Sequence, residues 1–255
     1  FKYAVTNQHA SPAPKPFEIR GSRYFIDEPI ETCEQGEFDS ICFVQNETSN
    51  GTQVSNESIR KIREANPSAL HAIDATSSMA GVRLDWPLAD VWFASVQKCF
   101  GLPSGLAVMV VSPRAVERAI LLNELNHYNS FLTIRANFQK YQTPYTPNIL
   151  GISLLHYWAK FIQPISEVEK ETLAKKNALV DYIQSSSFRL LVKNTAVQSN
   201  TVLAIEADTQ TVFELKEKAA KEGIILGNGY GEWQNTTFRI ANFPANTMKE
   251  INNLI

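Results

Sequence analysis

A single lysine, Lys98, stands between two apolar segments, and this setting is the feature of the sequence most suited to chemistry. Residues 92–96 precede it, and the turn sequence Gly-Leu-Pro-Ser-Gly at 101–105 leads to a second apolar segment at 106–111. Apolar segments of this length, bounded by turn residues, are typical of buried strands. A lysine between buried strands is costly unless it is paired, deprotonated or covalently bound. Because a desolvated lysine loses its proton more readily, the sequence predicts an amine nucleophile able to form a Schiff base.

Polar residues follow three predicted buried strands at the point where each strand ends. Asn-Glu-Thr at 46–48 comes after the first strand, Asp74 ends the second, and Gln-Lys at 97–98 follows the third. In an open parallel sheet, ligands bind at the carboxyl ends of the strands. We therefore expect these three groups to converge on one site.

Strands and helices alternate along the chain, which predicts an α/β fold with a largely parallel sheet. The predicted strands are residues 41–45, 70–74, 90–95, 105–111, 201–205, 224–226 and 238–241. The predicted helices are residues 55–64, 148–161, 166–184 and 212–222, with further helices starting at 112–113 and 247. Ser166 with Glu169, and Thr247 with Glu250, have the spacing of capping boxes. The proline-rich residues 9–16 predict a loop or an extended segment.

Composition and charge are those of an ordinary soluble globular protein. The chain has 255 residues, of which 44% are hydrophobic and 20% charged, enough for one large core or two domains. A formal net charge of −2 gives no reason to expect nucleic acid or an anionic membrane as a partner. No apolar run reaches the ~18 residues of a membrane span, and the segment that starts at Phe1 lacks the pattern of a signal peptide.

The cysteines and histidines show no metal-like spacing. The chain has an odd number of cysteines, Cys33, Cys42 and Cys99. We therefore expect reduced thiols in a cytoplasmic protein. Cys99, next to Lys98, is expected to be a small apolar filler rather than a nucleophile. The four histidines have no ligand spacing, and no metal site is predicted.

Three motifs together resemble those of the class-V aminotransferases, which have fold type I and depend on pyridoxal 5'-phosphate (PLP). The motifs are Asn-Glu-Thr-x-x-Gly from Asn46, Asp-Ala-Thr-Ser-Ser from Asp74, and Ser-x-Gln-Lys ending at Lys98. The similarity extends over most of the chain. Within the family it is greatest to the phosphoserine aminotransferases, followed by the serine–pyruvate and alanine–glyoxylate enzymes. The resemblance implies a PLP-binding large domain at 1–150, with a mostly parallel sheet, and a smaller C-terminal α/β domain at 151–255.

The resemblance assigns three residues to the ring of the cofactor. Lys98 is expected to hold PLP covalently and to move the substrate proton between Cα and the C4' carbon. Asp74 is expected to pair with the pyridine nitrogen and keep it protonated, so that the ring can accept electrons. Thr48 is expected to hydrogen-bond the 3'-oxygen of the ring.

Further residues match positions that bind the cofactor phosphate or the substrate. Gln97 is expected at the phosphate, helped by Ser77 or Ser95. Thr143 matches a segment that reaches the phosphate of the neighbouring subunit's cofactor, which implies a homodimer with shared active sites. Arg239 matches the arginine that binds the substrate α-carboxylate, a task suited to a bidentate guanidinium.

Each of these residues also has an ordinary structural interpretation. Lys98 could be a surface lysine at the start of a loop, and Asp74 could be a helix N-cap while still binding a ligand. Thr48 could cap a following helix, and Thr143 could be only a turn residue before proline. Arg239 could be exposed on an edge strand.

The chain departs from the family pattern in two places. Family members begin with a longer N-terminal portion, which carries the glycine-rich turn for the phosphate and the aromatic residue that stacks on the ring. We therefore expect the full protein to be longer than this chain. Phosphoserine aminotransferases also carry a His-Arg pair before the carboxylate arginine, whereas residues 227–235 hold no basic residue and include Glu232. A carboxylate there would repel a phosphate, which argues against phosphoserine as the substrate.

The resemblance implies transamination between a small amino acid and a 2-oxo acid by a ping-pong route. The nearest enzymes are the phosphoserine aminotransferases, and the alternative is a serine or alanine–glyoxylate (pyruvate) enzyme. Cysteine desulfuration ranks below both, because Gln97 stands where such enzymes usually carry histidine and the C-terminal half has no cysteine. An alternative of another class is a non-catalytic dimeric scaffold with the same fold.

Overall fold

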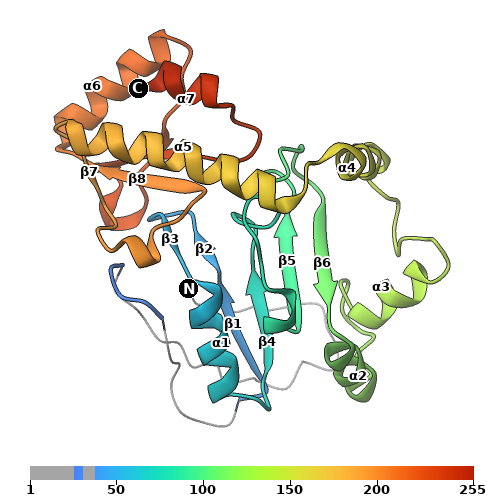
Figure 1. Ribbon diagram of the computed structural model, residues 1–255. Helices are drawn as coiled ribbons and strands as arrows, with labels where there is room; N and C mark the ends of the chain where they lie inside the picture. Colours follow the sequence, from blue (N-terminus) through green and yellow to red (C-terminus); the bar gives the residue numbers. More distant parts are fainter. Residues whose placement is uncertain (1–25, 31–37) are drawn as a thin grey trace.

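A computed structural model describes residues 26–30 and 38–255 of the chain (Figure 1). The predicted loop at 9–16 and Cys33 lie outside these residues. The strands are β1 Ser40–Val44, β2 Asn46–Glu47, β3 Thr52–Gln53, β4 Leu70–Asp74, β5 Val91–Ser95, β6 Ala107–Val111, β7 Arg189–Leu190, β8 Val202–Glu206, β9 Gly227–Asn228 and β10 Thr237–Ala241. The α-helices are α1 Asn56–Ala65, α2 Pro113–Leu122, α3 Phe131–Phe138, α4 Ile149–Phe161, α5 Ile165–Ser185, α6 Thr209–Lys221 and α7 Met248–Leu254.

The first sheet has the order β1-β4-β5-β6 and is mostly parallel, as predicted. β1 pairs with β4 and β4 with β5 in parallel, while β6 runs antiparallel to β5. In this register Asp74 lies beside Val44 on one side and Phe93 on the other. The carboxyl ends of three neighbouring strands therefore meet at one edge of the sheet.

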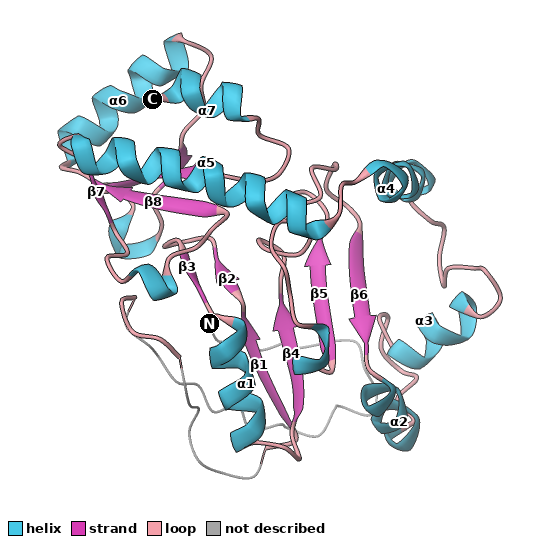
Figure 2. Cartoon of the chain, viewed as in Figure 1, coloured by secondary structure: helices cyan, strands magenta, loops and turns pink. Residues whose placement is uncertain are grey.

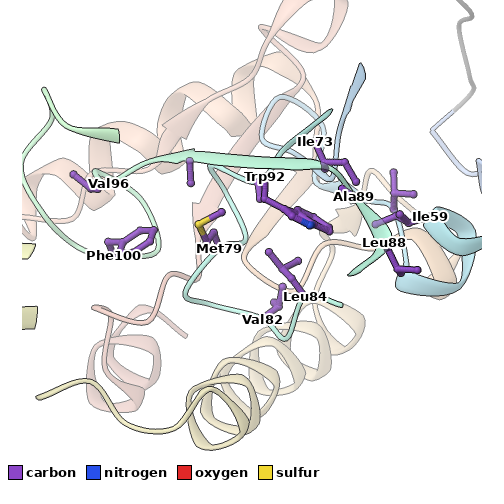
Figure 3. Close-up of a cluster of buried hydrophobic side chains, with 13 residues drawn as sticks. Ile59, Ile73, Met79, Val82, Leu84, Leu88, Ala89, Trp92, Val96 and Phe100 are labelled. Carbon is purple, nitrogen blue, oxygen red and sulfur yellow. The ribbon is translucent and has the colours of Figure 1, made fainter. Parts of the chain in front are cut away.

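One face of this sheet is covered by a core that draws on residues from several segments (Figure 3). Ile59 on α1, Ile73 on β4 and Trp92 on β5 are almost completely buried. α1 turns Ile59 inward because its apolar residues recur at helical spacing and its first turn is capped by Ser55, whose side chain accepts from the N–H of Ser58. Burying each such large side chain stabilises the fold by about 1.5–3 kcal/mol. This core holds the strand ends that carry the polar residues.

The second sheet has the order β7-β8-β10-β9, and all its pairings are antiparallel. Helices α5, α6 and α7 pack on it through a second core that includes Leu179, Ile205 and Phe238. Figure 2 shows α5 running along β8. α4 packs back on the first core, where the rings of Trp158 and Phe100 lie 4.7 Å apart. A domain boundary near residue 150 stays a prediction.

Three local expectations were wrong or incomplete. Residues 224–226 are not a strand, because Ile225 is 94% exposed and the chain joins the sheet only at β9. The capping box expected at the start of α5 is absent; Pro164 caps this helix without a side-chain bond, and Glu169 instead accepts from the N–H of Arg83. α3 was not predicted, since it spans eight residues and buries none of them.

Other local expectations are confirmed. The side chains of Thr247 and Glu250 form the expected capping box at α7. Ser112 caps α2 with Pro113 in its first turn. Among residues 26–30 and 38–255, no helix combines the length and apolar character that crossing a membrane requires.

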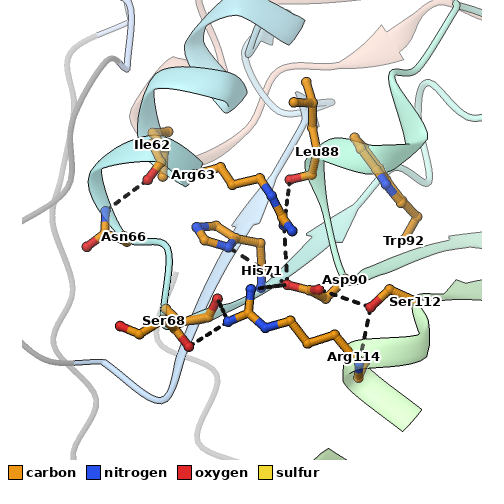
Figure 4. A network of polar contacts seen from close by, with 12 residues as sticks. Ile62, Arg63, Asn66, Ser68, His71, Leu88, Asp90, Trp92, Ser112 and Arg114 are labelled. Carbon is orange, nitrogen blue, oxygen red and sulfur yellow. Dashed lines mark hydrogen bonds and ion pairs between the residues drawn. The ribbon is translucent and has the colours of Figure 1, made fainter. Parts of the chain in front are cut away.

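A buried carboxylate, Asp90, lies just before the first residue of β5 and binds residues of neighbouring segments (Figure 4). This end of the sheet is opposite the carboxyl ends of β1, β4 and β5. Asp90 is 1% exposed and accepts hydrogen bonds from the backbone N–H of His71 and the hydroxyl of Ser112, at 3.0 and 2.9 Å. Arg63 and Arg114 lie 3.3 and 3.8 Å from its Oδ2. A buried charge with this many partners is fully compensated, so this cluster has a structural role.

Candidate active site

A cavity of about 410 Å³ opens where the carboxyl ends of β1 and β4 face the loop between β9 and β10. Its walls combine carboxylates, cations and hydroxyls from both sheets. The lining residues are Val44, Asn46, Glu47, Thr48, Ser49, Asp74, Thr76, Ser77, Lys98, Tyr230 and Arg239.

The amine of Lys98 is held by two hydroxyl groups in this cavity. Nζ donates to Oγ1 of Thr48 at 2.7 Å and to Oγ of Ser77 at 2.9 Å. Lys98 is half-buried in the turn that follows β5, and its amine is held by protein hydroxyls. Thr48 also does not cap a helix, because a turn and the short strand β3 follow it. The structure therefore brings together three of the residues that the sequence singled out.

The surroundings of Lys98 make its amine easier to deprotonate than the amine of a solvated lysine. Burial lowers the pKa of the amine, and the charge of Arg239 adds to this, while Asp74 and Glu47 oppose it. The net effect places the pKa of Lys98 below its ordinary value. A deprotonated amine has a lone pair for attack on a carbonyl carbon, as nucleophilic lysines require.

Asp74 lies at the end of β4 with its carboxylate fixed by the following turn. Oδ1 accepts from the backbone N–H of Thr76 at 2.8 Å, while the residue also lines the cavity. The hydroxyl of Thr76 accepts in turn from the backbone N–H of Ser95. The alternative of a helix N-cap is wrong, because a turn rather than a helix follows Asp74. Its carboxylate binds the N–H of that turn and also lines the cavity.

Arg239 reaches the cavity from the second sheet. It lies on β10, which has β8 and β9 as neighbours, so the alternative of an edge-strand arginine is wrong. Nε donates to the carbonyl of Asn228 at 2.6 Å, and Nη1 donates to the carbonyl of Thr48 at 2.7 Å. These bonds fix the plane of the guanidinium, whose fork of donors suits a carboxylate.

The motif from Asn46 to Gly51 needs its glycine. Gly51 has a φ of +77°, and a Cβ there would lie 3.0 Å from the carbonyl oxygen of Val202 and 3.1 Å from the amide nitrogen of Ala204. Its carbonyl accepts from the N–H of Ser199 at 2.8 Å. Only a residue without a side chain lets this turn meet the β8 backbone so closely.

The remaining predicted residues lie in different places. Ser77 is buried in the cavity wall. Gln97 is exposed and Ser95 half-buried, and neither lines the cavity formed by the described residues. Thr143 is exposed, and its hydroxyl donates to the carbonyl of Tyr145. The phosphate-binding and partner-binding roles of these residues stay predictions.

Sequence reasoning assigned no individual role to six residues that line the cavity: Val44, Asn46, Glu47, Ser49, Thr76 and Tyr230. Glu47 is part of a motif already noted, and its carboxylate accepts from the N–H of Ser49 at 2.8 Å. Tyr230 lies between two glycines, and a Cβ at Gly229 would be only 2.2 Å from the carbonyl oxygen of Trp233. That glycine pair is the sequence signal that a tightly constrained loop presents Tyr230.

A model of the family Aminotransferase class-V matches residues 27–254. The chain belongs to the class-V aminotransferases. It is 29% identical over 216 residues to a phosphoserine aminotransferase of Corynebacterium glutamicum, covering 81% of this chain and 56% of that protein. The crystal structure of a phosphoserine aminotransferase from Cytophaga hutchinsonii matches with a TM-score of 0.79 and 30% identity, over 92% of this chain and 65% of that one.

An aspartate aminotransferase structure from Thermus thermophilus shares the fold, with a TM-score of 0.77 at 21% identity over 88% of this chain and 65% of that one. The expected family and the fold type I architecture are thereby confirmed. PLP is the cofactor of class-V aminotransferases, as expected from the motifs. This class-V chain spans little more than half the length of the Corynebacterium relative that it matches.

The residues of the cavity fit the ring of PLP. The cofactor requires an amine for its carbonyl carbon, an anion for its ring nitrogen and a hydrogen-bonding group for its ring oxygen. Lys98, Asp74 and Thr48 carry groups of these three kinds, and the lowered pKa of Lys98 suits a covalent bond through nitrogen.

Proposed function

We propose that the protein is a PLP-dependent aminotransferase that moves an amino group between a small amino acid and a 2-oxo acid. The observation that carries this proposal is the half-buried amine of Lys98, which donates to Thr48 and Ser77 in a cavity shared with Asp74 and Arg239. An amine with a lowered pKa, a fixed carboxylate and a fixed guanidinium are the three groups that such a reaction needs.

Each group has a distinct task. When bound, PLP supplies an electron sink for the pair released as the substrate Cα–H bond breaks. Asp74 holds the positive charge of the ring nitrogen, and Arg239 orients the substrate by its carboxylate. Lys98 would hold the cofactor and, once its amine is released by the substrate amino group, would accept the proton from Cα, a task suited to an amine whose pKa burial has lowered.

The substrate class is phosphoserine aminotransferase-like, which would place the enzyme in serine biosynthesis. The names of the Corynebacterium and Cytophaga relatives support this assignment. A serine or alanine–glyoxylate enzyme is the alternative, because Lys98 and Arg239 are the only cations among the described residues that line the cavity. A phosphate on the substrate would therefore need a further basic group.

We also propose a homodimer in which Thr143 reaches the partner's cofactor phosphate. Exposed apolar side chains flank Thr143 in the sequence, namely Tyr141, Tyr145 and Leu150, and they support an interface that includes this segment. Two further elements of the proposal are a division into domains at 1–150 and 151–255 and a cytoplasmic location. The separate sheets support the division, and the free thiols of Cys42 and Cys99 are consistent with a reducing compartment.

The test is the visible absorption spectrum of the natural full-length protein after addition of PLP. Wild-type protein is expected to turn yellow and to retain the colour after gel filtration, whereas Lys98→Ala loses it. Lys176→Ala is the matched control, since Lys176 is also half-buried with its pKa lowered by burial but lies outside the cavity. A colourless wild-type protein would contradict the aminotransferase proposal and favour the alternative of a non-catalytic scaffold with the same fold.

Single amino acids then identify the donor. L-phosphoserine, L-alanine, L-serine and L-glutamate are added separately to the yellow protein, and loss of the visible band is recorded. A response to phosphoserine supports the phosphoserine aminotransferase assignment. A response to alanine or serine, but none to phosphoserine, supports the alternative of a serine or alanine–glyoxylate enzyme. No response to any of the four amino acids overturns the proposed reaction.

A further inference from the structure

The hydroxyl of Thr201 forms a hydrogen bond to the turn that carries Ser77. Thr201 lies immediately before β8, and it is completely buried. Its Oγ1 donates to the backbone carbonyl of Ser77, a residue 124 positions away in the chain. The hydroxyl of Ser77 accepts in turn from Nζ of Lys98 at 2.9 Å. A residue next to the second sheet is therefore connected to the amine of Lys98 through a single intermediate residue.

The proton of the Thr201 hydroxyl has one good acceptor. The hydroxyl oxygen of Ser199 lies 3.4 Å from Oγ1 of Thr201, but it already accepts from the backbone N–H groups of Thr201 and Val202. Among the residues that the structure describes, no other donor reaches the carbonyl of Ser77. The hydroxyl of Thr201 and the carbonyl of Ser77 therefore depend on each other.

Close packing around the methyl group of Thr201 fixes the direction of its hydroxyl. A Cβ at Gly81 would lie 3.3 Å from Cγ2 of Thr201 and 2.8 Å from Sγ of Cys99, so the backbone of the turn lies close to both side chains. A β-branched side chain has few χ1 rotamers available. The methyl contact therefore keeps the hydroxyl directed at Ser77.

The turn depends on Thr201 for the position of Ser77. Its own backbone hydrogen bonds join other residues: the N–H groups of Ser78 and Met79 both donate to the carbonyl of Ala75, at 3.0 and 2.7 Å. Ser77 is 2% exposed, and a buried carbonyl left unpaired costs about 1–3 kcal/mol. Without the Thr201 hydroxyl, the turn is expected to shift until this carbonyl finds another donor, which would move the Ser77 hydroxyl away from Lys98.

We propose that Thr201 is a positioning residue, which holds the hydroxyl of Ser77 at the amine of Lys98. The inference rests on the proposed function for its consequence, because this amine is the one expected to hold PLP. Thr201 is not among the described residues that line the cavity, so it acts on the amine through Ser77. An acceptor beside an ammonium group stabilises the charged form, and loss of that acceptor should lower the pKa of Lys98 further.

The experiment measures how readily Lys98 reacts at different pH values in the full-length protein freed of PLP. A trace of acetic anhydride labels only neutral amines, and peptide mass spectrometry gives the pH at which labelling of Lys98 is half-maximal. Thr201→Val removes the hydroxyl and keeps the branched shape, whereas Thr201→Ser keeps the hydroxyl. Thr172→Val is the matched control, because Thr172 is equally buried, donates to the carbonyl of Val168 within α5 and does not line the cavity.

Thr201→Val is expected to lower the labelling midpoint of Lys98 by about one pH unit, the effect of losing one hydrogen bond from a charged group. Thr201→Ser and Thr172→Val should keep the wild-type midpoint. Asp74, Glu47, Cys99 and Arg239, whose charges also act on this amine, are the same in every variant.

A double variant shows whether the effect passes through Ser77. Thr201→Val combined with Ser77→Ala should have the midpoint of Ser77→Ala alone, because the hydroxyl that Thr201 positions is then absent. An unchanged midpoint in Thr201→Val, even with a lowered Tm, would assign Thr201 a purely structural role and overturn the proposal. Additive shifts in the double variant would overturn it as well.

Two provisions keep the test decisive. If Thr201→Val does not fold, Thr201→Ala removes the same hydroxyl with less bulk and takes its place in each comparison. The labelling needs no PLP, so it tests the position of Lys98 even if the wild-type protein binds no PLP, an outcome that would contradict the proposed function alone.

Discussion

The amine of Lys98 lies 2.7 Å from the hydroxyl of Thr48, although 50 positions separate them in the chain. The carbonyl of Thr48 accepts at the same time from the guanidinium of Arg239. Thr48 is therefore the point at which the lysine from the first sheet and the arginine from the second sheet meet. A site assembled in this way depends on how both sheets pack.

Replacing Lys98 with methionine should stabilise the cofactor-free protein at neutral pH. Burial lowers the pKa of Lys98, so the folded state holds this proton less tightly than the unfolded state does. The resulting penalty is fully present below the lowered pKa and disappears as the pH rises through it toward the unfolded value of about 10.4. Thermal unfolding should show a higher Tm for Lys98→Met at neutral pH, with a gap that narrows at alkaline pH. A gap that widens at alkaline pH would contradict the lowered pKa.

Replacing Arg239 with lysine should impair substrate binding more than folding. Lysine keeps the charge but cannot contact Asn228, Thr48 and a carboxylate with one planar group. We expect kcat/KM for the amino acid to fall by about 10- to 100-fold, mainly through KM, with a small change in Tm. Arg189→Lys is the control, because Arg189 is an exposed arginine on β7, and it should leave kcat and KM unchanged. Steady-state kinetics measure both constants. An unaltered KM in Arg239→Lys would show that Arg239 does not bind the substrate.

Replacing Asp90 with alanine should destabilise the protein by about 3–5 kcal/mol, the range for removing one member of a buried charge cluster. The backbone N–H of His71 and the hydroxyl of Ser112 would lose their acceptor, and Arg63 would lose its charged partner. Asp85→Ala is the control, since Asp85 forms an exposed ion pair with Arg60 that should contribute about 0–1 kcal/mol. Urea unfolding gives both values, and equal losses would refute the structural role of Asp90.

The same carboxylate predicts a loss of stability in acid. Burial raises the pKa of Asp90, but hydrogen bonds from His71 and Ser112 and the charges of Arg63 and Arg114 outweigh it, so the pKa is lowered. A lowered carboxyl pKa contributes stability above the unfolded value of about 3.9, and that stability is lost as the pH falls through the folded value. Asp90→Asn should show a shallower decline of the unfolding free energy in this acid range. An identical decline would mean that other groups carry the effect.

Cys99 should be inert in the folded protein despite its position beside Lys98. Burial raises the pKa of its thiol to about 12, and the side chain is 1% exposed. Since the thiolate is the reactive form, a chromogenic disulfide reagent should not modify it at mildly alkaline pH. Cys99→Ser should leave the number of reactive thiols unchanged in native protein and lower it by one after denaturation. A lower count in the native state would show that Cys99 is accessible.

Much of the local structure was predictable because local signals specify it. The apolar runs of β4 and β5, the spacing of Ile59 and Ile62 on α1, and the Thr247–Glu250 capping box each act within a few residues. Where local signals gave a wrong prediction, the burial of the segment in the tertiary structure determined its conformation. Ile225 belongs to an apolar run but lies almost fully exposed, and no short-range pattern reports which side of a segment meets a core.

The sequence by itself determined the chemical groups of the site: a lysine after one strand, an aspartate at the end of another, and a motif that carries threonine and glycine. The tertiary structure decided which of these groups touch. It placed Tyr230 and Glu47 in the cavity wall and left Nδ2 of Asn46 without a partner among the described residues. The reason is physical: hydrogen bonds such as Ser199 to Asn46 join residues 153 positions apart. Their geometry follows from the packing of two sheets rather than from any property of the chain near either residue.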